Sequence, residues 1–284
     1  MKKIKLVTSL LFFAVLSFGV FTACQPDDVE IGNGIAGEEL DATFSVTPVE
    51  GAVNKYMVKS LATNYMTSKW NIGNGDPTFV GKMEEEIYFP DAGTYAVKHY
   101  AVGIGGESFV AEKNVVVTTS DPAANLIQGG LFATAEDHAK WTVLKISNGD
   151  FWKFNTGSVS ITTGGGWSQQ AIYQAVQVEA GQRYKIDMNV ASTQGLADTW
   201  FEVYASTTVP VQGADYATGA VVRSINTWAG CGLAPFDGLI STVGCDRNEG
   251  LITFPSSGTV YLVIKCGSGG TPTITIKDVQ FRKK

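Results

Sequence analysis

The sequence predicts an all-β fold made of two consecutive β-sandwiches. Short runs in which apolar and polar residues alternate, such as ATFSVTP and TYAVKHYAV, recur along the chain, and a period of two is typical of half-buried strands. Glycine accounts for 32 of the 284 residues, which fits a protein with many turns. The sequence lacks long amphipathic helical patterns, and it is longer than a single core usually organises.

The first residues predict an exported protein. Lysines in MKKIK are followed by an apolar run from Leu6 to Phe21 and then by small residues, which is the pattern of a cleaved secretory signal peptide, here residues 1–23. The run is too short to favour a membrane-spanning helix. The segment FTAC resembles the lipobox of bacterial lipoproteins, which implies acylation of Cys24 and anchoring in outer-membrane lipid. The alternative is an ordinary cleaved signal in which the Cys24 thiol is incidental.

The segment after Cys24 bears on localisation and charge. QPDD, directly after the cysteine, resembles the acidic export signal of Bacteroidetes-type lipoproteins and implies exposure at the cell surface. Loss of the signal peptide removes three lysines and no acid, so the formal net charge falls from −6 to −9. A basic patch for nucleic acid is therefore not expected. Residues 24–40 are acidic and glycine-containing without periodicity, which predicts a flexible tether.

A second break divides the rest of the chain. In TTSDPAAN, residues 118–125, an Asp-Pro pair ends a valine-rich run, as expected of a linker. We therefore predict one domain over residues 41–120 and another over residues 124–284. Both contain short strand-like runs bounded by turn residues, so each is expected to form an antiparallel sandwich.

The domain over residues 41–120 carries two recognisable segments. WNIGNGDPTF and DAGTYAVKHYAV resemble the polycystic-kidney-disease (PKD) type of immunoglobulin-like domain, with Asn74 where that family usually has Asp. The resemblance implies an immunoglobulin-like spacer. In such a domain Trp70 and Tyr95 belong to the core and do not contact ligand.

The domain over residues 124–284 holds five of the six tryptophans and about ten strand-like runs, which suits a jelly roll. NLIQGGLF, AIYQAVQVEAGQRYKIDMNV and ITIKDVQF resemble, in that order, the carbohydrate-binding modules of families 4, 9 and 22. The resemblance implies a β-jelly roll of galactose-binding-like topology that binds glycans. Those modules often place Glu after the Phe of the first motif, where it supports a structural calcium ion. Ala133 stands there instead, which leaves Glu136 and Asp278 as candidate calcium ligands.

Strand periodicity sorts the candidate binding residues. In TWFEVYAS, Phe201, Val203 and Ala205 share the core face, so the residues between them face the other way. In RYKIDMNVA the apolar residues alternate with polar ones in the same manner. If the two strands are neighbours, one sheet face carries aromatic, carboxylate and amide groups together, although a solvated polar face is the alternative. The candidates from these strands are Trp200, Glu202, Tyr204, Asp187 and Asn189.

Two more tryptophans are candidates because of their loops. Trp167 follows three glycines, which leave it without neighbouring side chains at the entrance to a strand. Trp228 lies in INTWAGCG, beside Cys231. Each indole either projects into a binding site or packs over the end of the sandwich. Trp141 and Trp152 lie within apolar runs and are expected in the core.

Three cysteines remain after Cys24. In an oxidising compartment they give one disulfide and one free thiol. We favour Cys231 with Cys245, with Cys245 and Cys266 as the alternative pair. The sequence lacks zinc-binding spacings and lacks the motifs of serine hydrolases, zinc proteases and phosphate-binding loops, so we expect a protein that is not an enzyme and needs no cofactor.

These features together favour a surface glycan-binding lipoprotein. The layout is similar to that of the accessory lipoproteins of polysaccharide-utilisation systems, and the resemblance implies oligosaccharide or polysaccharide as ligand and an outer-membrane glycan transporter complex as partner. The alternative is a structural or adhesive surface lipoprotein that binds a protein. A polysaccharide-degrading enzyme is a lesser alternative, since the carboxylates of the second domain cannot be paired from the sequence.

Overall fold

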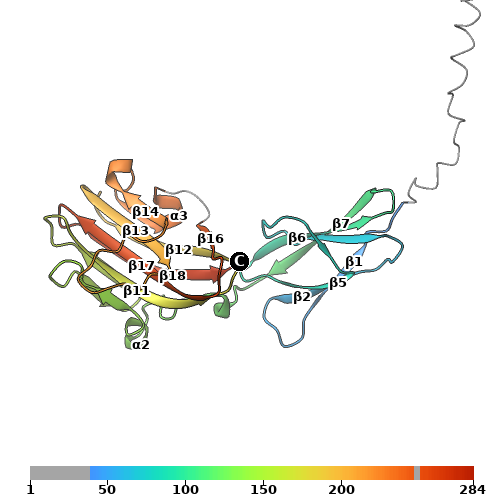
Figure 1. The fold of residues 1–284 in the computed structure, drawn as a ribbon, viewed down its shortest axis with the longest axis horizontal. Helices are drawn as coiled ribbons and strands as arrows, with labels where there is room; N and C mark the ends of the chain where they lie inside the picture. Colours follow the sequence, from blue (N-terminus) through green and yellow to red (C-terminus); the bar gives the residue numbers. More distant parts are fainter. Residues whose placement is uncertain (1–38, 246–249) are drawn as a thin grey trace, which may run out of the picture.

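The computed structural model describes residues 39–245 and 250–284. The predicted signal peptide, Cys24 and nearly all of the predicted tether lie outside these residues. The all-β prediction is confirmed: the described chain forms two β-sandwiches arranged end to end, with the last residues of the chain at their junction (Figure 1). Helical segments within these ranges are short. They are η1 (Pro122–Ala124), α2 (Ala135–His138), η2 (Thr227–Ala229) and α3 (Ile240–Val243).

The N-terminal sandwich consists of a three-stranded and a four-stranded antiparallel sheet. The first sheet has the order β1-β2-β5, and the second has the order β4-β3-β6-β7. The strands are β1 (Phe44–Pro48), β2 (Lys55–Ser60), β3 (Thr67–Asn71), β4 (Phe79–Gly81), β5 (Glu84–Tyr88), β6 (Gly93–Val102) and β7 (Ser108–Val117).

Aromatic rings fill the core between these two sheets. Trp70 is fully buried, its ring centroid lies 5.3 Å from that of Phe44, and its indole N–H donates to the carbonyl of Lys82 at 2.9 Å. Tyr95 stacks on Phe89 with ring centroids 4.0 Å apart. The prediction that Trp70 belongs to the core is therefore confirmed, and Tyr95 packs against the same cluster.

The C-terminal sandwich has a six-stranded and a five-stranded sheet. The first has the order β15-β12-β18-β10-β9, with β16 also paired to β12, and the second has the order β14-β13-β17-β11-β8. The strands are β8 (Thr142–Leu144), β9 (Trp152–Asn155), β10 (Ser158–Thr162), β11 (Ser168–Val178), β12 (Arg183–Ser192), β13 (Thr199–Ser206), β14 (Val221–Asn226), β15 (Phe236–Leu239), β16 (Leu251–Thr253), β17 (Gly258–Ser268) and β18 (Thr273–Lys283).

The alternation predicted for β12 and β13 is confirmed on their inner faces. Phe201 and Val203 of β13 are fully buried, as are Ile186 and Met188 of β12. However, the two strands belong to different sheets, because the chain crosses the sandwich between them. Their outer faces therefore point away from each other, and the prediction that both strands contribute to one polar face is wrong.

Polar contacts of Arg282 join the two sandwiches. Its Nε donates to Oδ1 of Asp91 at 2.7 Å, and one terminal nitrogen donates to the carbonyls of Pro90 and Asp121, each at 2.8 Å. Lys284 donates to the other oxygen of Asp91 at 2.7 Å. Asp91 thus accepts from two cations, one on each carboxylate oxygen, and a largely buried arrangement of this kind fixes orientation more strongly than an exposed ion pair.

Candidate functional site

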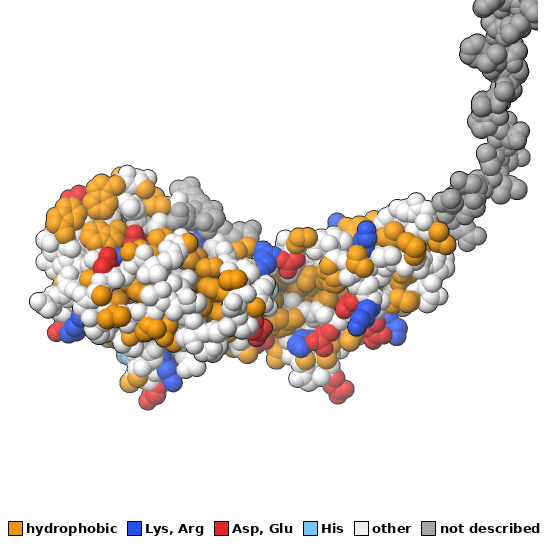
Figure 2. Space-filling view, in the orientation of Figure 1, with side chains coloured by type: hydrophobic (Ala, Val, Ile, Leu, Met, Phe, Trp, Pro, Cys, Tyr) orange, Lys and Arg blue, Asp and Glu red, His pale blue; other side chains and the backbone are white. Residues whose placement is uncertain are grey.

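Three tryptophans from separate segments of the C-terminal sandwich meet on its surface. The ring centroids of Trp167, Trp200 and Trp228 lie 6.1 to 6.4 Å apart, and their planes are inclined by 16° to 38°. Trp167 and Trp228 are 59% and 58% exposed, while Trp200 is partly buried. Figure 2 shows hydrophobic side chains gathered at the end of the C-terminal sandwich away from the junction. We call these three residues the tryptophan platform.

The loop between β10 and β11 holds Trp167 in place by its backbone. Gly165, Gly166 and Trp167 all have positive φ, at 72°, 58° and 67°, a region that glycine adopts freely and tryptophan does not. The N–H of Gly166 donates to the carbonyl of Gly269 at 2.9 Å, and that of Ser168 donates to Gly165 at 3.0 Å. The glycines preceding Trp167 therefore permit the tight turn that projects its indole.

Glycines of the segment from β17 to β18 make room for two of the indoles. Gly267 lies directly opposite Trp200 in the β13–β17 ladder, and a Cβ on Gly267 would overlap the Trp200 ring. A Cβ on Gly269 would lie 3.4 Å from the ring of Trp167. The rings thus lie close against backbone that carries no side chains.

The third indole is held by a capped turn and a disulfide. In η2, the side chain of Asn226 accepts from the N–H of Trp228 at 3.0 Å, and Gly230 ends the turn with φ of 85°. The structure has a disulfide between Cys231 and Cys245, the pair that we favoured. Cys266 is free and buried, and burial raises the pKa of its thiol.

Polar groups border the platform. Asp198 is exposed, and its backbone carbonyl accepts a hydrogen bond from the N–H of Gly269 at 2.9 Å. Its side chain and the ring of Trp167 both lie beside Gly269. Gln169 is partly exposed and lies across Gly267 from Trp200, in the same row of the sheet. Both residues can offer oxygen or nitrogen atoms at the rim of the aromatic surface.

Glu202 and Tyr204 share the outer face with Trp200 but form an internal network. The hydroxyl of Tyr204 donates to Oε2 of Glu202 at 2.7 Å, and Nζ of Lys265 lies 3.2 Å from the same oxygen. Tyr216 packs edge-on against Tyr204, which is only 4% exposed. The predicted stacking role of Tyr204 is therefore wrong, because its ring is covered. Burial, together with the hydrogen bond to Glu202, raises the pKa of Tyr204.

Asp187 and Asn189 lie on β12, in the opposite sheet from Trp200. Asp187 is 5% exposed, and its carboxylate accepts from the hydroxyl of Ser241 at 2.6 Å and from the N–H of Ser241 at 3.2 Å. It anchors α3 against the sheet. The prediction that these two residues share a binding surface with the tryptophans is therefore wrong.

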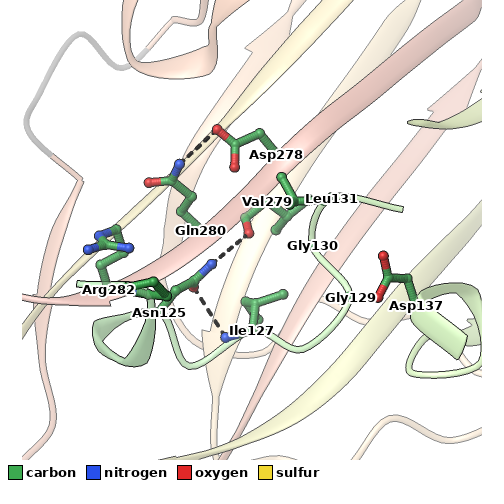
Figure 3. A pocket seen from close by; sticks show the side chains of 11 residues that line it. Asn125, Ile127, Gly129, Gly130, Leu131, Asp137, Asp278, Val279, Gln280 and Arg282 are labelled. Carbon is green, nitrogen blue, oxygen red and sulfur yellow. Dashed lines mark hydrogen bonds between the residues drawn. The ribbon is translucent and has the colours of Figure 1, made fainter. Parts of the chain in front are cut away.

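The candidate calcium ligands do not meet in the structure. Asp278 has a positive φ of 48° and accepts from the side-chain amide of Gln280 at 2.8 Å. It lines a pocket of about 310 Å³ together with Asp137, on the other side of that pocket, whereas Glu136 is not among the lining residues (Figure 3). Within residues 39–245 and 250–284, histidine, cysteine, aspartate and glutamate form no cluster of three or more that could hold a metal ion.

The other tryptophans predicted in the core behave differently from the platform. Trp141 is buried and Trp152 packs against the core from a partly buried position.

Helices long and apolar enough to cross a membrane are absent from the described part of the chain.

Several residues of the site were missed from the sequence. Gly267 and Gly269 lie under the indoles, and Asp198 and Gln169 border them. The only signal for the glycines was the segment CGSGG, which ends a strand and begins a turn. Its position below the rings depends on which strand pairs with Trp200, and the sequence does not reveal that pairing.

Comparison with known proteins gives weak structural similarities. The chain matches no protein-family model and no curated protein. A structure of carbohydrate-binding modules of the β-sandwich superfamily with promiscuous specificity matches with a TM-score of 0.34 at 12% identity, covering 84% of this chain and 96% of that one. A carbohydrate-binding module of family 4 matches with a TM-score of 0.34 at 14% identity, over 51% of this chain and 96% of that one.

An enzyme also lies among the similar structures. The enzymatically active domain of tailspike protein 4 from bacteriophage CBA120 matches with a TM-score of 0.37 at 12% identity, over 60% of this chain and 23% of that one. The function proposed below therefore rests on the geometry of the site itself.

Proposed function

We propose that this protein binds glycans without catalysis and that the tryptophan platform is its binding site. The observation that carries the proposal is the meeting of three indoles from separate segments of the chain, two of them more than half exposed, with ring planes inclined by 16° to 38°. Large exposed aromatic patches are unusual on a soluble surface and mark binding sites.

A sugar ring suits this surface for physical reasons. A pyranose presents C–H groups on its faces and hydroxyl groups around its rim, so flat indoles can cover the faces while polar groups satisfy the rim. Asp198 and Gln169 are placed beside the indoles to do so. The glycines beside Trp200 and Trp167 let the indoles lie close to the backbone, without neighbouring side chains at those positions.

The magnitude expected is that of weak, reversible binding. Covering about 80 Å² of apolar surface on each ring at about 25 cal/mol per Å² contributes on the order of 2 kcal/mol per stacked aromatic. Each exposed hydrogen bond adds about 1 kcal/mol or less. After the cost of association, a Kd of roughly 10⁻⁴ to 10⁻⁵ M is expected. Many copies on one surface would hold a polymer far more tightly.

The proposed location follows from the sequence motifs. Acylation of Cys24 would anchor the protein in outer-membrane lipid, and the N-terminal sandwich would act as a spacer that carries the platform away from the membrane. The platform lies at the turn between β17 and β18, whereas the last residues of β18 lie at the junction of the two sandwiches (Figure 1), which suits this arrangement. A glycan gathered there would be passed to an outer-membrane transporter complex.

A non-catalytic role is favoured by the partners of the nearest carboxylates. Glu202 is occupied by Tyr204 and Lys265, whereas glycosidases need two carboxylates free to act across one bond. Asp198 is exposed beside the platform but lies on a loop. Incubation with any glycan that binds is expected to release no new reducing ends.

Isothermal titration against glucans, xylans, mannans and algal polysaccharides tests the proposal. Binding should also change the tryptophan fluorescence, because three of the six indoles lie at the site. The control is Phe79→Ala, which removes an exposed aromatic residue from the N-terminal sandwich and should leave binding unchanged. If the folded protein binds none of the glycans, or if Phe79→Ala weakens binding as much as Trp167→Ala does, the platform is not a glycan site. Binding of a protein partner would then explain the exposed rings better.

A further inference from the structure

A polar hollow adjoins the tryptophan platform. It has a volume of about 480 Å³ and lies between the β12–β13 loop and the β17–β18 loop. Its polar side chains come from Ser192, Thr193, Gln194, Thr271 and Thr273. We call this hollow the loop pocket.

The loop pocket begins one residue away from the platform. Ala197 and Gly270 belong to its lining, and the residues next to them, Asp198 and Gly269, are joined by a hydrogen bond of 2.9 Å. Gly269 is also the residue beside the ring of Trp167. The pocket and the platform therefore adjoin each other at Asp198 and Gly269.

The side chains of the loop pocket are available to a ligand. Thr193, Gln194 and Thr271 are exposed, and within the described chain none of them has a side-chain hydrogen bond to protein. Hydroxyl and amide groups both donate and accept hydrogen bonds, as sugar hydroxyls do. The hydroxyls of the other two polar residues are already engaged, since Ser192 donates to the carbonyl of Thr273 at 2.9 Å and the hydroxyl of Thr273 shares a hydrogen bond of 2.8 Å with that of Thr162.

The charges around the pocket disfavour an acidic ligand. The residues lining it are all uncharged, and the exposed Asp198 follows the lining residue Ala197 and lies, like the ring of Trp167, beside Gly269. Lys265, the lysine on the same sheet face, is 3% exposed and is paired with Glu202 and Asp215 at 3.2 Å. A uronate or sulfate group would therefore meet a negative charge and find no free cation among the described residues of the site.

We infer that the loop pocket is a second saccharide subsite, continuous with the platform, and that the ligand is an uncharged glycan chain of at least two units. The inference rests on the proposed function. One unit stacks on the indoles, and the chain continues past Asp198 and Gly269 into the pocket, where Gln194 and Thr271 bond its hydroxyls.

A length series of neutral oligosaccharides tests the subsite. With the purified protein, affinity should rise about tenfold from the shortest to the longer oligomers, the gain expected of one or two exposed hydrogen bonds. Gln194→Ala combined with Thr271→Ala should abolish this gain and leave the affinity for the shortest oligomer unchanged. Trp167→Ala should weaken the binding of the shortest and of the longer oligomers. Thr207→Ala is the matched control, because Thr207 is exposed just after the far end of β13 and should change neither.

A second comparison tests the charge of the ligand. Oligomers of one length that differ only in carboxylate or sulfate groups should bind several-fold more weakly than the neutral form, and Asp198→Asn should narrow that difference. Tighter binding of the acidic form would overturn the choice of an uncharged ligand. Binding that is independent of chain length and of Gln194 and Thr271 would overturn the subsite alone, whereas absence of binding at every length would overturn the proposed function and the subsite together.

Discussion

The indole of Trp200 lies over Gly267, the residue directly opposite it on β17. Any larger side chain at position 267 would push the ring away from the sheet, because a Cβ there would overlap ring atoms of Trp200. The absence of a side chain on one strand thus sets the orientation of an aromatic ring on the next. The same segment lies beside Trp167 through Gly269.

Gly267→Ala is expected to weaken glycan binding without destabilising the fold. Gly267 does not need a positive φ, and alanine in a strand is favoured over glycine by about 0.5 to 1 kcal/mol. The ring of Trp200 is partly exposed and can swing outward, so the platform loses its shape while the core does not change. Titration should show a loss of about tenfold or more in affinity, with Tm unchanged or slightly raised.

The matched control for this change is Gly93→Ala. A Cβ at Gly93 would lie 3.5 Å from the ring of Tyr95, which is an ordinary contact, in the N-terminal sandwich. It should leave affinity unchanged. Equal losses of affinity in the two variants would contradict the role given to the contact between Trp200 and Gly267.

Substitution of each platform tryptophan by alanine should lower affinity by about 30-fold, the equivalent of about 2 kcal/mol for one stacked ring. Because Trp167 and Trp228 are 59% and 58% exposed, their removal should hardly change Tm. Trp200→Ala should cost more stability, since that ring is partly buried. Trp141→Ala is the contrast, because a buried tryptophan costs about 3 to 5 kcal/mol of stability when truncated.

The strands and their inner faces could be read from the sequence, but the assembly of the site could not. The period of two correctly sorts Phe201 and Val203 of β13, and Ile186 and Met188 of β12, into the core. The alternation of apolar and polar residues reveals only which residues of one strand share a face. It does not reveal that the chain crosses to the opposite sheet between β12 and β13, which is why Asp187 was misplaced.

The sequence identified the three tryptophans of the platform but not how they come together. The glycines before Trp167 and the cysteine near Trp228 marked two loops that could project an indole. Their approach to Trp200 depends on loop conformations from three parts of the chain. Tyr204 was misjudged for a related reason, since Tyr216, which covers it, comes from a loop that carries no strand period.

Removal of the disulfide should weaken binding through Trp228. Cys231 and Cys245 are 14 residues apart, and closing a loop of that length contributes about 3 kcal/mol in the chain-entropy model. Cys231→Ser with Cys245→Ser should lower Tm and reduce affinity several-fold, because the segment that carries Trp228 becomes less ordered. Cys266→Ser, at the free thiol, serves as control. A fall in Tm with unchanged affinity would mean that the disulfide stabilises the fold without positioning the indole.

The network of Tyr204 predicts a loss of stability in alkali. Burial and the hydrogen bond to Glu202 raise the pKa of Tyr204 above its ordinary value of 10.0. The folded protein therefore holds the phenolic proton more tightly than the unfolded chain does, and the stabilisation present below pH 10 is lost as the pH rises further. In Tyr204→Phe, urea unfolding between pH 9 and 11 should show a smaller dependence on pH than in the wild type. An unchanged dependence would show that Tyr204 does not titrate in this way.

The Arg282 junction should make the two sandwiches unfold together. Arg282→Met removes three hydrogen bonds to Asp91, Pro90 and Asp121, and breaking a largely buried ion pair costs on the order of 3 kcal/mol. Calorimetry should then resolve two thermal transitions in place of one. Glycan affinity should be unchanged, because the platform lies at the turn that precedes β18, whereas Arg282 lies near the other end of that strand.

Acid should mimic that substitution in the wild-type protein. Partial burial opposes ionisation of Asp91, but the hydrogen bonds and charges of Lys284 and Arg282 outweigh it and hold the pKa of Asp91 below its ordinary value of 3.8. The stabilisation is therefore present above pH 3.8 and is lost as the pH falls through the lower folded-state value. The two transitions should separate in that range in the wild type, while those of Arg282→Met should be less sensitive to pH. A single transition in Arg282→Met at neutral pH would mean that other contacts, such as the ion pair between Arg183 and Asp76, suffice to couple the sandwiches.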